Sequence, residues 1–167
     1  TLFRSIALKQ EYKKGIFSWF GFVMPLPKRL QFIKEVGFDS TTIWWEDEQG
    51  CPEILKEDMP QMVKDAGLFL ENIHVPYNNS NDLWSDNSSV RSKIVKQHIE
   101  WMEDCARFDI PAMVMHLTGE EDMPKPNKYG IQSLSHLTRK AEELGIKIAI
   151  ENTNPTDRVA FILSKIS

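Results

Sequence analysis

The chain has 167 residues, of which 41% are hydrophobic and 26% charged, and its formal net charge at pH 7 is −4. This composition predicts a globular protein, and the length suits one domain, residues 1–167, with a sizeable core. No basic run offers an extended phosphate-binding surface, and no stretch approaches the ~18 apolar residues of a membrane helix. Cys51 and Cys105 form no CxxC pair, so we expect neither a zinc ribbon nor a disulfide framework. A cytoplasmic location fits these features best.

Short apolar runs bounded by glycine, proline or polar clusters predict buried β-strands. They cover residues 15–20, 41–45, 68–77, 111–119 and 146–152. Apolar residues between these runs recur at helical spacing and predict helices over 28–36, 58–66, 90–108, 131–144 and from 156 or 157 onward. The polar stretch 78–89 is expected to be a loop, with Ser88 or Ser89 as the N-cap of the third helix.

Strand followed by helix, repeated five times, predicts parallel strands joined by right-handed crossovers. The last predicted strand has two different faces, Ile146, Ile148 and Ile150 on one and Lys147, Ala149 and Glu151 on the other. Branched apolar residues toward helices and small or polar residues inward are typical of a barrel strand. We therefore expect an α/β fold of the parallel (β/α) TIM-barrel type.

Three chemically competent side chains stand at the carboxyl ends of separate predicted strands: His74, His116 and Glu151. Active sites of parallel α/β sheets and barrels lie at these ends. A carboxylate on the inward face of an apolar strand costs several kcal/mol to bury unless it is paired or bound to a cation. Glu151 is therefore the strongest candidate. A structural salt bridge for Glu151 and a backbone hydrogen bond for each histidine are the competing interpretations.

The motifs around these residues resemble the xylose-isomerase-like TIM barrels: His74-Val-Pro-Tyr77, Met115-His116-Leu-Thr-Gly119 and Ile150-Glu151-Asn152. This superfamily contains sugar and sugar-phosphate isomerases and epimerases and the type-IV abasic-site endonucleases. Its fold has eight βα units and typically ~250 residues, whereas five units are predicted here. We therefore expect the sequence to be part of a longer chain, whose later strands supply further metal ligands and a second catalytic carboxylate. The alternative is a partner that completes the barrel.

The resemblance implies a divalent-metal-dependent isomerase or epimerase. Its substrate would be a small sugar, sugar phosphate or polyol, and its chemistry an enediolate-type proton transfer. By the same resemblance Glu151 is both metal ligand and proton-transfer base. His116 and His74 complete the expected metal set and, in the epimerase-like branch, more often hold substrate hydroxyls; His116 is also assigned to catalysis. Whether the ion is Mn, Zn, Mg or Co stays open.

Further substrate contacts are expected from aromatic and polar residues near the strand ends. Trp19, with Trp44 and Trp45, would offer an apolar wall for a sugar ring. Tyr77 and Asn152 belong to the resembling motifs, and Glu46 follows the second strand. Plain packing is the competing interpretation for each tryptophan, and an exposed loop charge is the competing one for Glu46.

Two other functions remain open. In an abasic-site endonuclease, His74, His116 and Glu151 would hold zinc. The acidic balance and the lack of Lys/Arg clusters weigh against nucleic acid as a partner, because DNA affinity comes mainly from phosphate neutralisation. The other alternative is a non-catalytic barrel that binds a sugar or a protein. Assembly into a homo-oligomer is compatible with each function.

Overall fold

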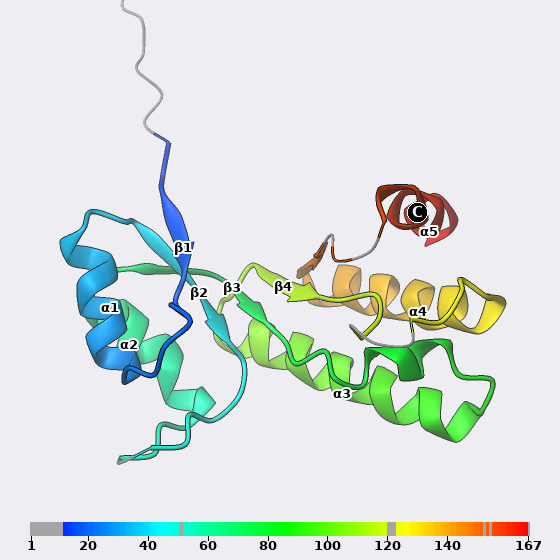
Figure 1. The fold of residues 1–167 in the computed structure, drawn as a ribbon, viewed down its shortest axis with the longest axis horizontal. Coiled ribbons are helices and arrows are strands. Elements are labelled where there is room, and N and C mark those ends of the chain that lie inside the picture. Colours follow the sequence, from blue (N-terminus) through cyan, green and yellow to red (C-terminus); the bar gives the residue numbers. More distant parts are fainter. Residues whose placement is uncertain (1–11, 51, 120–122, 152, 154, 167) are drawn as a thin grey trace, which may run out of the picture.

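The computed structural model describes residues 12–50, 52–119, 123–151, 153 and 155–166. Five parallel strands form one sheet in the order β1-β2-β3-β4-β5, and each is followed by a helix (Figure 1). The strands are β1 (Gly15–Phe17), β2 (Ser40–Trp44), β3 (Phe69–His74), β4 (Ala112–Met115) and β5 (Lys147–Ile150). The helices are α1 (Leu26–Glu35), η1 (Lys56–Asp58), α2 (Met59–Asp65), η2 (Ser80–Trp84), α3 (Ser88–Arg107), α4 (Lys128–Leu144) and α5 (Thr156–Ile166).

Strands that are consecutive in the chain are neighbours in the sheet, as in a (β/α) barrel. All four pairings are parallel, which confirms the predicted α/β class and the predicted parallel arrangement of the strands. The five strands form part of a barrel. Parallel strands have their carboxyl ends at the same end of the sheet. The last residues of β1, β2 and β3 therefore lie there together: Phe17, Trp44 and His74.

The two faces of the sheet differ in burial. On β4, Met113 and Met115 are fully buried in the core, while Ala112 and Val114 on the other face are half-buried. On β5, Ile148 and Ile150 alternate in the same way with exposed residues. The predicted alternation is therefore correct, and the methionine face is the one that packs into the hydrophobic core.

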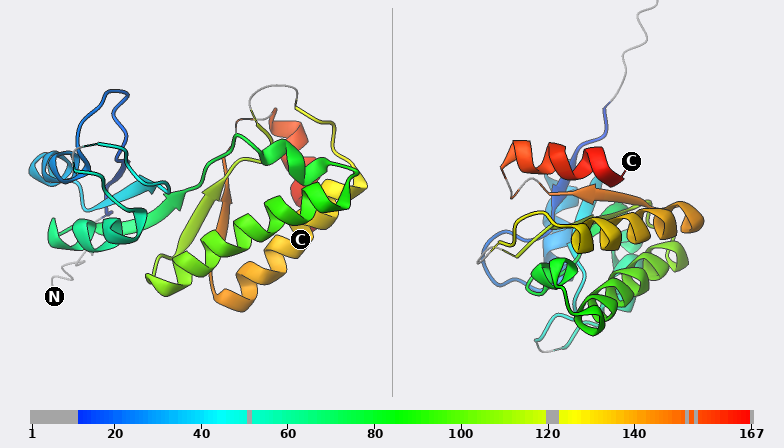
Figure 2. Two further views of the ribbon diagram at one scale, coloured as in Figure 1. Left: turned by 90° about the horizontal axis from the view of Figure 1, so that it is seen from below. Right: turned by 90° about the vertical axis from the view of Figure 1, so that its right-hand side faces the viewer.

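Helices α3 and α4 pack side by side (Figure 2), and α5 packs against α4. The short helix η2 lies within the stretch predicted as loop and contacts both α3 and α4. Its Trp84 ring lies directly on the backbone of Gly130, and its indole N–H donates to the carbonyl of Leu117 over 2.7 Å. None of the described helices combines the length and the apolar character needed to cross a bilayer.

The N-cap of α3 is Asn87, so the predicted cap at Ser88 or Ser89 is wrong by one or two positions. The side-chain oxygen of Asn87 accepts from the backbone N–H groups of Ser89 and Val90, at 3.0 and 3.4 Å. Asparagine and serine are about equally good caps, so composition alone does not choose between neighbours. The prediction was nevertheless right that a cap in this stretch starts the helix.

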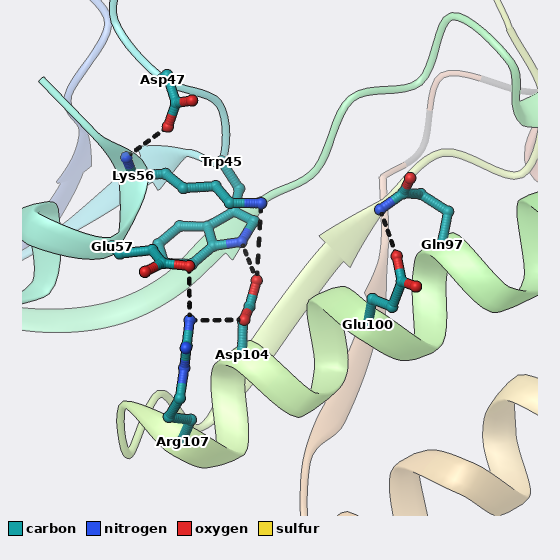
Figure 3. A network of polar contacts seen from close by, with 8 residues as sticks. All are labelled: Trp45, Asp47, Lys56, Glu57, Gln97, Glu100, Asp104 and Arg107. Atoms are coloured by element: carbon teal, nitrogen blue, oxygen red, sulfur yellow. Dashed lines mark hydrogen bonds and ion pairs between the residues drawn. The ribbon is translucent and has the colours of Figure 1, made fainter. Parts of the chain in front are cut away.

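A network of hydrogen bonds and ion pairs links the segment after β2 to the last turn of α3 (Figure 3). Asp104 accepts from the Trp45 indole at 3.0 Å and from Arg107 at 2.9 Å, and its carboxylate lies 3.8 Å from the Lys56 ammonium. Arg107 also bonds Glu57 at 3.2 Å. Trp45 is 1% exposed. Trp45 therefore packs in the core, which was one of the two roles predicted for it, while its neighbour Trp44 lines the cavity described below.

Candidate active site

The three predicted side chains meet at the carboxyl edge of the sheet. His74 is the last residue of β3, and His116 and Glu151 directly follow β4 and β5. Oxygen Oε2 of Glu151 lies 2.6 Å from Nε2 of His74 and 3.1 Å from Nε2 of His116. One potential ligand atom from each residue lies within 4.8 Å of the other two. We call these residues the His-His-Glu triad.

The backbone fixes the orientation of the His74 ring. Nδ1 of His74 lies 3.1 Å from the carbonyl oxygen of Val75, and a carbonyl only accepts, so Nδ1 carries a proton. In the neutral ring, Nε2 then presents a lone pair to the Glu151 carboxylate. Two lone pairs at hydrogen-bond distance repel unless a proton or a cation stands between them. A histidine whose other nitrogen donates to a backbone carbonyl is the usual arrangement at metal sites, so the triad suits a cation.

The triad also shifts the acidity of Glu151. Burial by itself raises the pKa of this carboxyl. When the two histidine rings are protonated, the hydrogen bond with His74 and the positive charges of His74 and His116 outweigh that effect, so the pKa of Glu151 lies below its usual value. Glu151 is therefore ionised at neutral pH, the form required of a metal ligand and of a proton acceptor.

Aromatic rings pack against both histidines of the triad. Trp44, the last residue of β2, stacks on His74 with ring centroids 5.1 Å apart, and Phe17, the last residue of β1, lies 5.8 Å from the same ring. Tyr77 stacks on His116 at 4.0 Å. Each of the five described strands thus contributes one residue to the candidate site, at or next to its carboxyl end.

A cavity of about 680 Å³ opens beside the triad, and all three triad residues line it. Its walls also include Phe17, Trp19 and Trp44. Small-molecule sites typically have volumes of ~300–1,000 Å³, mostly apolar walls and a few convergent polar groups. The cavity meets each of these criteria and is large enough for a small sugar.

The remaining predicted residues fall in different places. Trp19, about half exposed, and Tyr77 both line the cavity. Glu46 is exposed and is not part of the cavity wall; its carboxylate accepts from the Trp44 indole at 2.5 Å. Asn152 lies outside the described residues.

Sequence reasoning missed an ion pair in the cavity wall. Arg29 of α1 is 3% exposed and donates to the carboxylate of Glu48, which lies in the segment after β2. Burial lowers the pKa of Arg29. One signal was present in the sequence: Arg29 lies four residues before Ile33 and three after Leu26, so a charge interrupts the apolar stripe of the helix.

Solved structures with the same fold include several sugar-converting enzymes. A D-psicose 3-epimerase determined in the presence of D-fructose is 15% identical, with a TM-score of 0.69 over 93% of this chain and 60% of that one. A D-allulose 3-epimerase from Methylomonas sp. is 12% identical, with a TM-score of 0.72 over 92% and 58%. A sugar phosphate isomerase/epimerase from Parabacteroides distasonis is 15% identical, with a TM-score of 0.66 over 96% and 66%.

The chain thus spans about three fifths of the length of these structures. At such low identities the likeness shows the fold alone. No curated protein sequence matches the chain. The family model described as "Xylose isomerase-like TIM barrel" matches residues 30–162. The chain therefore belongs to the xylose isomerase-like TIM barrel family, and its five described strands form part of such a barrel.

Proposed function

We propose that this chain belongs to a divalent-metal-dependent isomerase or epimerase that acts on a small sugar, sugar phosphate or related polyol. The observation that carries the proposal is the His-His-Glu triad, with its three potential ligand atoms within 4.8 Å of one another in a sugar-sized cavity. The family and the sugar epimerases among the structural neighbours support the same reaction class.

The donor set suits a divalent transition metal. Two imidazole nitrogens and one carboxylate oxygen favour zinc, cobalt or manganese over magnesium, which prefers oxygen ligands. His74, His116 and Glu151 would hold the ion. When bound, the metal polarises the carbonyl of the substrate and acidifies the neighbouring C–H bond.

Glu151 is the proposed proton acceptor. Both histidine contacts go to Oε2, so Oε1 is engaged by neither ring. Because the lowered pKa keeps the carboxylate ionised, it can take a proton from the carbon next to the substrate carbonyl. In an epimerase, a second proton-transfer group would return a proton to the opposite face of the substrate.

The aromatic residues are proposed to hold the sugar. The Trp19 and Trp44 rings offer apolar faces to ring carbons, and Tyr77 a phenol to hydroxyl groups. Asn152 and Glu46 are also proposed as substrate contacts, on the basis of their positions in the sequence. Cleavage of abasic DNA is less well supported, because Arg29, the one Arg or Lys among the described cavity-lining residues, is already bonded to Glu48.

Proton exchange with solvent tests this proposal directly. The intact protein is incubated with Mn²⁺ and D-fructose in D₂O, and the sugar carbons are followed by NMR. We expect deuterium at a carbon next to the carbonyl and loss of the exchange after EDTA treatment. Exchange that is absent, or that persists without metal, would contradict the proposal.

A further inference from the structure

The Arg29–Glu48 pair is built into the same cavity as the triad but takes no part in the proton transfer proposed above. Arg29 is 3% exposed, and its Nε is buried without a hydrogen-bond acceptor among the described residues. Its guanidinium also lies 5.8 Å from the centre of the Trp19 ring. A buried donor without an acceptor, in the wall of a cavity, is a place where a ligand oxygen is favourable.

Glu48 is held firmly in position. Its backbone N–H donates to the carbonyl oxygen of Ile54 over 2.9 Å, and its own carbonyl accepts from the backbone N–H of Ile54 over 3.1 Å. The two bonds form a small antiparallel bridge. Ile54 is itself buried at 6% exposure and anchors this bridge in the core. The Glu48 side chain keeps 30% of its surface exposed, so a ligand in the cavity can reach it.

The charges of the cavity decide what this pair can bind. Arg29 is the one Arg or Lys among the described residues that line the cavity, whereas the acidic residues there are Glu48 and Glu151. A phosphate bound at Arg29 would lie beside the Glu48 carboxylate, and juxtaposed like charges are strongly unfavourable. A sugar hydroxyl both donates and accepts. Neighbouring hydroxyls can therefore accept from Arg29 and donate to Glu48.

We propose that Arg29 and Glu48 bind the uncharged, hydroxyl-bearing end of the substrate, and that Glu48 excludes a phosphate group from this end. The substrate class is then an unphosphorylated sugar or polyol. This inference rests on the proposed sugar-converting function, which leaves open whether the substrate is phosphorylated.

The test compares D-fructose with D-fructose 6-phosphate as probes on the intact, Mn²⁺-loaded protein. Affinities are measured by calorimetry, with inorganic phosphate as a competitor in a second series. We expect wild type to bind D-fructose at least about tenfold more tightly than its phosphate ester, and inorganic phosphate to compete poorly. Tighter binding of the phosphate ester by wild type would overturn the inference, and this comparison needs no variant.

Glu48→Gln keeps the size of the side chain and frees the charge of Arg29. It should reduce the preference for D-fructose by about tenfold or more and make inorganic phosphate an effective competitor. Glu35→Gln, which removes the same charge from an exposed position on α1, should leave the ratio of affinities unchanged within about twofold. An unchanged ratio in Glu48→Gln, in a protein whose near-UV circular dichroism matches wild type, would refute the role of Glu48.

The double variant Arg29→Gln/Glu48→Gln removes both charges. It should bind D-fructose more weakly and gain no phosphate competition; a gain would show that Arg29 is not the phosphate-responsive cation. If neither sugar binds while Mn²⁺ still raises the melting temperature, this inference fails and the metal site stands. If the expected preference is found without proton exchange in D₂O, the proposed function fails and this inference stands.

Discussion

The imidazole of His116 lies flat on the ring of Tyr77, with centroids 4.0 Å apart and 1° between the two planes. His116 follows β4 and Tyr77 follows β3, so the stack joins the ends of two neighbouring strands. It fixes the plane of the imidazole while Nε2 lies 3.1 Å from the Glu151 carboxylate. Tyr77 is therefore a positioning residue for the triad.

Removing this stack should loosen the proposed metal site. We expect Tyr77→Ala to weaken Mn²⁺ or Zn²⁺ binding by about 10–100-fold, the usual effect of losing an outer-shell partner. Tyr77→Phe keeps the stacked ring and should retain most of the affinity. Calorimetric metal titration measures both. Equal losses in the two variants would show that the hydroxyl, and not the stack, supports His116.

Glu151→Gln keeps the size of the side chain but removes its charge and its proton acceptor. If Glu151 is both ligand and base, the variant should bind metal more weakly and lose more turnover than the ~10²–10⁴-fold expected for a base alone. Glu142→Gln, an exposed substitution on α4, is the matched control. Unchanged metal affinity and turnover in Glu151→Gln would remove the basis of the active-site assignment.

His98 should make folding stability depend on pH. It is fully buried on α3, and burial lowers its pKa from 6.5, although its hydrogen bond to the Ile94 carbonyl opposes the shift. Below pH 6.5 the unfolded chain binds a proton that the folded chain does not, so stability falls as the pH falls. The limiting slope is about 1.4 kcal/mol per pH unit for one proton.

Urea unfolding in EDTA between pH 8 and pH 5 measures this slope. His98→Phe keeps a ring against Trp101, whose centroid lies 5.0 Å from that of His98, and should flatten the pH dependence. His136→Gln, on the exposed side of α4, should leave the slope as in wild type. Identical slopes in wild type and His98→Phe would count against a neutral buried histidine.

Gly130→Ala should destabilise the fold even though alanine is the better helix former. A Cβ at this position would lie 1.9 Å from the Trp84 ring, which is 3% exposed and tied to Leu117 by its indole N–H. We expect a loss of about 1–3 kcal/mol in the free energy of unfolding, as for other overpacked cores. Gly50→Ala meets only an ordinary contact and should change stability by less than about 0.5 kcal/mol. Trp84→Phe combined with Gly130→Ala should recover part of the loss.

The order and type of the main elements could be predicted because apolar periodicity and helix-ending glycines mark them in the sequence. The boundaries were less accurate. The first strand was expected to reach residue 20, because the aromatic run continues, but the ladder with β2 ends where the Ser18 N–H bonds the Thr42 carbonyl. Helix η2 was missed because its asparagine- and serine-rich sequence resembles a loop, although Leu83 and Trp84 anchor it in the core.

The triad could be predicted because strand ends are visible in the sequence, and parallel strands bring their ends together. The Arg29–Glu48 pair could not, because it joins a helix to a loop 19 residues further along the chain. No local pattern encodes such a contact. Arg29 interrupts the apolar stripe of α1, which indicated that its charge needed a partner. The sequence did not indicate which residue that partner would be.

The agreement between chain order and sheet order has a consequence for how the protein is made. Each strand pairs with the one synthesised just before it, so the sheet can grow at one edge while the ribosome is still adding residues. His74 and His116 are synthesised before Glu151. The proposed His-His-Glu metal site is therefore assembled only when β5 docks, and the gain of metal affinity by a lengthening nascent chain would time that event.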